Sequence, residues 1–112
     1  QACGAVAFGI GGMLGEEVVI DQSGRQLTTD FVDYIMPRAT DVPPIALGHH
    51  DTPNPITFMG LKGAGEAGTI GPPAAIANAV CDALRDYGLD ITETPITPMT
   101  IRQAVHHRGV TL

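Results

Sequence analysis

The chain has 112 residues and a mass of 11.7 kDa, so we expect residues 1–112 to belong to a single domain. Its formal net charge is −6 and Lys62 is its single lysine, which argues against nucleic acid and against anionic membrane surfaces as partners. Apolar runs stay shorter than the roughly 18 residues of a transmembrane helix, so we expect no membrane association. A hydrophobic content of 44% excludes a disordered chain.

Cysteine and histidine usage indicates neither a disulfide framework nor a metal site. Cys3 and Cys81 are the two cysteines and lie far apart in the sequence, which is typical of a protein of the reducing cytoplasm. The histidines form two adjacent pairs, at 49–50 and 106–107. Neighbouring side chains point apart on a helix or a strand, so neither pair forms a metal site by itself. We therefore expect no metal ligand in this chain.

Residues 1–14 have apolar side chains at helical spacing but are rich in glycine. Each glycine inside a helix costs about 1 kcal/mol relative to alanine. A helix here makes sense if it packs against something that needs a bare backbone. The sequence leaves two candidates for that neighbour, a second helix and a bound cofactor.

The following segments predict short strands, which makes the expected fold class α+β. Residues 16–21 and 26–29 read as two strands joined by a turn, and residues 89–94 read as a third strand. Thr97 before Pro98 predicts the N-cap of a last helix, which Gly109 would end.

A glycine-rich loop precedes the longest expected helix. Five glycines fall within residues 60–71, which demands an unusual backbone path. Pro72 and Pro73 are a helix start signal, and an apolar stripe continues to residue 87. Gly88 supplies the stop. We therefore expect a helix over residues 72–87.

Residues 63–68 match the pattern GxGxxG literally, so a dinucleotide-binding turn is one interpretation. The segment before the loop is short and flanked by proline, unlike a buried parallel strand. The expected helix starts after the third glycine, and no second βαβ half is visible. These observations make this interpretation the weakest of those considered.

Glu66 stands in the middle of the glycine loop. A carboxylate on such a backbone can approach a ligand closely, and the positive end of the following helix points toward it. This arrangement suits a general base. A solvated glutamate on a surface turn is the alternative, and the residues alone leave both open.

Four motifs in order resemble the C-terminal part of the molybdopterin-binding large chain of molybdenum hydroxylases, the family of xanthine oxidase, aldehyde oxidoreductase and carbon monoxide dehydrogenase. They are Gly9-Ile10-Gly11 with Glu16-Glu17, Asp33-Tyr34 with Pro37, residues 60–66 with 72–80, and residues 95–101. Phe8 departs from the glutamine that many members have before Gly-x-Gly.

The resemblance implies roles for three residues. Glu66 matches the catalytic base of the family, which takes a proton from a molybdenum-bound hydroxide. Gln1 matches a glutamine that contacts the pterin, and Gly65 is the best candidate for close backbone access to the cofactor.

The resemblance also implies a cofactor and partners. The cofactor is molybdenum–molybdopterin, in the cytosine dinucleotide form that bacterial relatives commonly use. Iron–sulfur clusters and FAD would lie in partner domains or subunits, together with the remainder of the large subunit. The substrate would be an aldehyde, an N-heteroaromatic or a similar small molecule, oxidised with water-derived oxygen.

A rival interpretation is a non-catalytic split or vestigial module that acts as an assembly partner. The abrupt start at Gln1 and the departure at Phe8 are compatible with it. Under the enzyme interpretation the chain contributes the base but not the rest of the site, so we expect it to be inactive alone.

Overall fold

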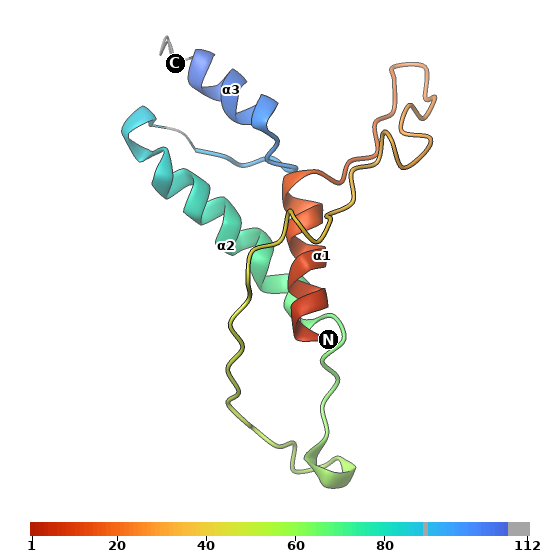
Figure 1. The fold of residues 1–112 in the computed structure, drawn as a ribbon, viewed down its shortest axis with the longest axis vertical. Coiled ribbons are helices and arrows are strands. Elements are labelled where there is room, and N and C mark those ends of the chain that lie inside the picture. The colour runs from red at the N-terminus through yellow and green to blue at the C-terminus, as the bar shows by residue number, and fades with distance from the viewer. Residues whose placement is uncertain (89, 108–112) are drawn as a thin grey trace.

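Three α-helices form the described part of the fold, which covers residues 1–88 and 90–107 of a computed structural model (Figure 1). They are α1 (Ala2–Leu14), α2 (Ala67–Ala83) and α3 (Pro98–His107), and short 3₁₀ turns lie at Phe58–Gly60 (η1) and Arg85–Tyr87 (η2). None of the helices in these ranges is long and apolar enough to cross a bilayer.

The main contact between helices is that of α1 with α2, and glycines allow it. A Cβ built on Gly9 would lie 3.0 Å from Cβ of Pro72, and one built on Gly68 would lie 2.6 Å from Cβ of Ala5. The helix expected at residues 1–14 is confirmed. The neighbour that requires bare backbone at Gly9 is a helix.

The expected mixture of short strands is wrong for the described residues. Segments 16–21 and 26–29 do turn back on each other, but they meet in a single antiparallel bridge between Ile20 and Gln26. The side chains of Val18 and Ile20 are 54% and 61% exposed, so no buried face fixes a longer ladder. Residues 90–92 form no strand, and Leu89 lies outside the described residues.

The long helix starts five residues earlier than the sequence predicts. It begins at Ala67, so Gly68 and Gly71 belong to its first turns and the two prolines lie inside it. Proline lacks an N–H, so the carbonyls of Gly68 and Thr69 lose their usual intrahelical donors. Packing of this segment on α1 outweighs the start signal at Pro72. The α-helix also ends earlier than predicted, at Ala83 instead of residue 87, and the chain continues as the separate 3₁₀ turn η2. The expected stop at Gly88 is confirmed, because Gly88 has left-handed backbone (φ 62°) directly after η2.

A small core joins the end of α1 to α3. Met13, Ile96 and Val105 are buried, and the N–H of Ile96 donates to the carbonyl of Met13 at 2.7 Å. Thr97 caps α3 as expected, since its Oγ1 accepts a hydrogen bond from the N–H of Thr100 at 3.1 Å. Gly109, the expected end of this helix, lies outside the described residues.

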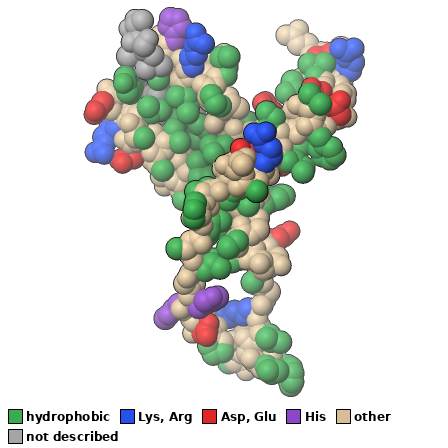
Figure 2. All heavy atoms as spheres, viewed as in Figure 1, with side chains coloured by type: hydrophobic (Ala, Val, Ile, Leu, Met, Phe, Trp, Pro, Cys, Tyr) green, Lys and Arg blue, Asp and Glu red, His purple; other side chains and the backbone are tan. Residues whose placement is uncertain are grey.

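Residues 43–65 form a long arm that leaves the helices and returns to the start of α2 (Figure 1). The N–H of Asn54 donates to the carbonyl of Gly60 at 3.1 Å and closes the tip of the arm. Apolar side chains gather there (Figure 2), among them Ile56, Phe58 and Met59, which are 78% to 91% exposed.

The arm and the loop at residues 16–36 give the chain a large surface. Its accessible area is 8789 Å², whereas a compact protein of this mass exposes about 5900 Å². Its radius of gyration is 17.9 Å against about 13 Å for a compact domain of this length.

Candidate active-site segment at the N-termini of α1 and α2

The N-terminal ends of α1 and α2 lie at the same end of the helix pair and bring the three sequence-predicted site residues together (Figure 1). Gln1 is the N-cap of α1 and Glu66 is the N-cap of α2. The side-chain Nε2 of Gln1 donates a hydrogen bond of 3.4 Å to the carbonyl of Gly65. Two residues that are 64 positions apart in the sequence therefore meet next to the candidate base.

At the start of α2 the backbone carbonyl of Glu66, and not its side chain, makes the local hydrogen bonds. The carbonyl of Glu66 accepts hydrogen bonds from the N–H of Thr69 at 3.0 Å and from its Oγ1 at 2.7 Å. The Glu66 side chain makes no capping hydrogen bond, and the residue is exposed. The carboxylate is thus exposed to solvent, and the positive end of a 17-residue helix favours its negative charge.

The glycines before Glu66 leave room at its backbone. A Cβ at Gly63 would meet nothing within 4 Å, and one at Gly65 would meet Nε2 of Gln1 at 3.8 Å. The first N–H groups of both helices have no intrahelical acceptor, which makes this end of the pair suitable for phosphate. Open backbone, helix N-termini and an amide side chain fit a phosphate-bearing pterin cofactor.

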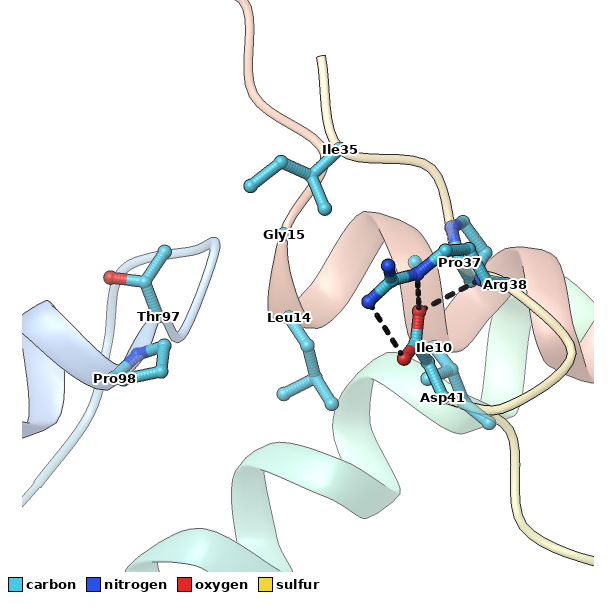
Figure 3. Close-up of a pocket in the computed structure, with 10 residues that line it drawn as sticks. Ile10, Leu14, Gly15, Ile35, Pro37, Arg38, Asp41, Thr97 and Pro98 are labelled. Atoms are coloured by element: carbon cyan, nitrogen blue, oxygen red, sulfur yellow. Dashed lines mark hydrogen bonds and ion pairs between the residues drawn. The ribbon is translucent and has the colours of Figure 1, made fainter. Parts of the chain in front are cut away.

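A separate cavity of about 330 Å³ lies at the opposite, C-terminal end of α1 (Figure 3). Its walls come from the last turns of α1, the segment at residues 35–41 and the start of α3. At its edge, Nε of Arg38 lies 3.0 Å from Oδ2 of Asp41. Hydrogen bonding to Arg38 lowers the pKa of the Asp41 carboxyl, and the same contact raises the pKa of Arg38. Sequence reasoning missed this pair, because a three-residue spacing in a proline-rich loop gives no signal.

A second unpredicted contact joins two parts of the loop that follows α1. The hydroxyl of Tyr34 donates to Oε2 of Glu16 at 2.6 Å, and this hydrogen bond raises the pKa of Tyr34. The Glu16 side chain lies over Gly11, where a Cβ would meet Oε1 of Glu16 and, at 2.6 Å, Cδ of Pro37. Two of the sequence motifs, the one that contains Gly11 and Glu16 and the one that contains Tyr34 and Pro37, therefore meet at one place.

The structure describes no candidate metal centre within residues 1–88 and 90–107, since no three His, Cys, Asp or Glu side chains gather there. His49 and His50 are exposed on the arm. Cys3 and Cys81 are free thiols.

The glycine pattern at residues 63–68 does not sit in a strand–turn–helix unit. The segment before it contains the 3₁₀ turn η1 where a dinucleotide-binding turn needs a strand. The argument that the helix starts after the third glycine was wrong, because Gly68 lies in the first turn of α2. The missing strand still excludes a dinucleotide-binding turn.

Comparison with known proteins gives the class of this chain. The model of a molybdopterin cofactor-binding domain matches residues 1–43. The nicotine 6-hydroxylase large subunit of Paenarthrobacter nicotinovorans is 42% identical over 104 residues, which are 93% of this chain and 13% of the relative. The xanthine dehydrogenase molybdenum-binding subunit of Escherichia coli O157:H7 is 34% identical over 98% of this chain and 14% of the relative.

A solved structure agrees with these relatives. The crystal structure of quinoline 2-oxidoreductase from Pseudomonas putida 86 superposes with a TM-score of 0.93 and 42% identity, over 96% of this chain and 14% of that chain. The chain belongs to the family of molybdenum hydroxylase large subunits. It spans about 13 to 14% of the length of the relatives it matches.

Proposed function

We propose that this chain contributes the catalytic base, Glu66, to a molybdenum hydroxylase. The observation that carries the proposal is the meeting of Gln1, Gly65 and Glu66 at the N-termini of two packed helices. The Glu66 carboxylate is exposed there and makes no capping hydrogen bond. A structural cap would use its oxygens on the helix, whereas this side chain is available to a reactant.

Different residues of this chain would bind the cofactor and accept the proton. A carboxylate oxygen of Glu66 takes a proton from the reacting water-derived oxygen, which raises the nucleophilicity of that oxygen. The Gln1 amide binds the pterin, and the bare backbone at Gly63 and Gly65 allows the cofactor to come close. When bound, molybdenum–molybdopterin supplies the two-electron oxidation and the activation of water.

The proposal includes the cofactor form, the partners and the compartment. Converging helix N-termini suit the phosphates of a cytosine dinucleotide form. The remainder of a large subunit would complete the site, and iron–sulfur clusters and FAD in other domains or subunits would carry the electrons away. The two free thiols agree with a reducing cytoplasm.

N-heteroaromatic molecules are the proposed substrate class. Nicotine 6-hydroxylase and quinoline 2-oxidoreductase carry the names of N-heteroaromatic compounds, and both are 42% identical to this chain. Such rings have an electron-poor carbon beside nitrogen, which a water-derived oxygen attacks. The enzyme that contains this chain should show a higher kcat/KM for a quinoline-type heterocycle than for an aldehyde.

Glu66→Gln in the hydroxylase that contains this chain tests the assigned role. The change preserves size and removes the proton acceptor, so we expect kcat to fall by about 10²- to 10⁴-fold. Molybdenum content should stay at the wild-type level, and the free energy of unfolding should fall by no more than about 1 kcal/mol, since the side chain makes no capping hydrogen bond and only its charge near the helix N-terminus is lost. Glu93→Gln is the matched control, because Glu93 is exposed and lies after α2, outside the site.

The rival function, a non-catalytic assembly module, predicts a different result. Turnover would then be absent in the wild type or unchanged by Glu66→Gln, while association with the partner subunits would persist. Equal loss of molybdenum and rate would instead assign Glu66 to cofactor retention.

A further inference from the structure

The two candidate site residues Gln1 and Glu66 are placed by a very close approach of the two helices. Gly68 lies two residues after Glu66, in the first turn of α2. A Cβ at Gly68 would lie 2.6 Å from Cβ of Ala5, 3.1 Å from the backbone nitrogen of Val6 and 3.2 Å from the carbonyl oxygen of Ala2. Two of these neighbours are backbone atoms of α1, so they cannot rotate away.

A second close contact lies one turn further along both helices. A Cβ at Gly9 would meet Cβ of Pro72 at 3.0 Å. Gly9 follows Ala5 by four residues, and Pro72 follows Gly68 by four residues. Two contacts with equal spacing fix both the separation of the helices and their axial register. This register sets where the Glu66 backbone lies relative to Gln1.

We propose that Gly68 is a positioning residue for Glu66, an inference that rests on the proposed function. Ordinary carbon–carbon contact requires about 3.5 Å. A methyl group at residue 68 would therefore move the first turn of α2 away from α1 by about 1 Å. Glu66 is the N-cap of that turn and moves with it. A misplacement of about 1 Å at a reacting group costs roughly 10²-fold in rate.

The chain offers a matched control on the same helix. Gly71 lies three residues after Gly68, and a Cβ there would meet nothing within 4 Å. Both substitutions to alanine add the same methyl group and the same helix propensity. The two variants differ in the contact with α1, so any difference between their kcat values reports the effect of that contact.

The test uses the complete hydroxylase with its redox partners. Gly68→Ala should lower kcat about 10²-fold, with KM and molybdenum content within twofold of wild type, whereas Gly71→Ala should leave kcat within twofold. A crystal structure of Gly68→Ala should show Glu66 displaced from Gln1. In a Glu66→Gln background, Gly68→Ala should change kcat less than threefold, because no base remains to be misplaced.

Gly68→Ala combined with Ala5→Gly addresses the case in which the single variant fails to fold. It removes the methyl group at the shortest contact, so folding and part of the lost kcat should return. Equal activity of Gly68→Ala and Gly71→Ala would overturn the positioning role and leave Glu66 as the base. Loss of molybdenum in proportion to kcat would also overturn it. A Glu66→Gln enzyme with normal turnover would overturn the proposed function itself.

Discussion

Two neighbouring glycines of α1 should respond in opposite ways to the same substitution. Gly12 is exposed, and a Cβ there would meet nothing within 4 Å. Gly12→Ala should therefore stabilise the helix by about 1 kcal/mol through propensity. At Gly11 a Cβ would meet Cδ and Cγ of Pro37 at 2.6 and 2.7 Å, together with the Glu16 carboxylate. Overpacking of this kind costs about 1 to 3 kcal/mol.

Both variants gain the same helix propensity, so the difference between their free energies of unfolding measures the contact of residue 11 with Pro37 and Glu16. A difference of 1 to 3 kcal/mol corresponds to about 5- to 150-fold in the exchange rate of α1 amide hydrogens. Hydrogen exchange with mass spectrometry on the parent protein measures this rate in peptides that cover residues 1–14. Equal exchange in Gly11→Ala and Gly12→Ala would refute the inferred packing of residues 16 and 37 on α1.

Two further predictions concern pH and the isolated chain. The Tyr34 pKa is raised above 10.0 by its hydrogen bond to Glu16, so this bond stabilises the fold below about pH 10 and is lost as pH rises through the raised pKa. Ionisation of the tyrosine phenol is followed by absorbance near 295 nm, and the part of the change that is absent in Tyr34→Phe belongs to Tyr34. The midpoint of this part should move to lower pH in Glu16→Gln, and an unchanged midpoint would contradict the contact. The 112-residue chain expressed alone should bind no molybdenum and should not keep its radius of gyration of 17.9 Å, because so much apolar surface is uncovered. Metal analysis with small-angle X-ray scattering checks this, and stoichiometric molybdenum at that radius would show it wrong.

The sequence predicted those features that local chemistry determines. Thr97 and Pro98 mark the start of α3, and Gly88 marks the stop after η2, because caps and left-handed glycines depend on a few adjacent residues. Glu66 stood out because glycines surround it. The bare-backbone requirement at residues 1–14 was also visible, although the sequence alone could not choose between a helix and a cofactor.

Features that depend on distant partners could not be predicted. The first turn of α2 precedes its prolines because Gly68 packs on Ala5, a contact between residues far apart in the sequence. Residues 16–21 and 26–29 have the composition of short strands joined by a turn, but Val18, Val19, Ile20 and Leu27 stay exposed among the described residues, and a single bridge forms. The cavity beside Arg38 depends on the docking of three segments and leaves no sequence pattern.

The arm links the exposed apolar tip directly to Glu66, the proposed base. Leu61 is 62% exposed at the tip, and only four residues separate it from Glu66. Any surface that covers the tip anchors one end of this short, glycine-rich connection, while α2 anchors the other. Covering the tip therefore removes conformational entropy from the backbone before Glu66. If assembly buries Ile56, Phe58 and Met59, part of the conformational entropy of the segment before the proposed base Glu66 is lost on assembly and does not have to be lost again at each turnover.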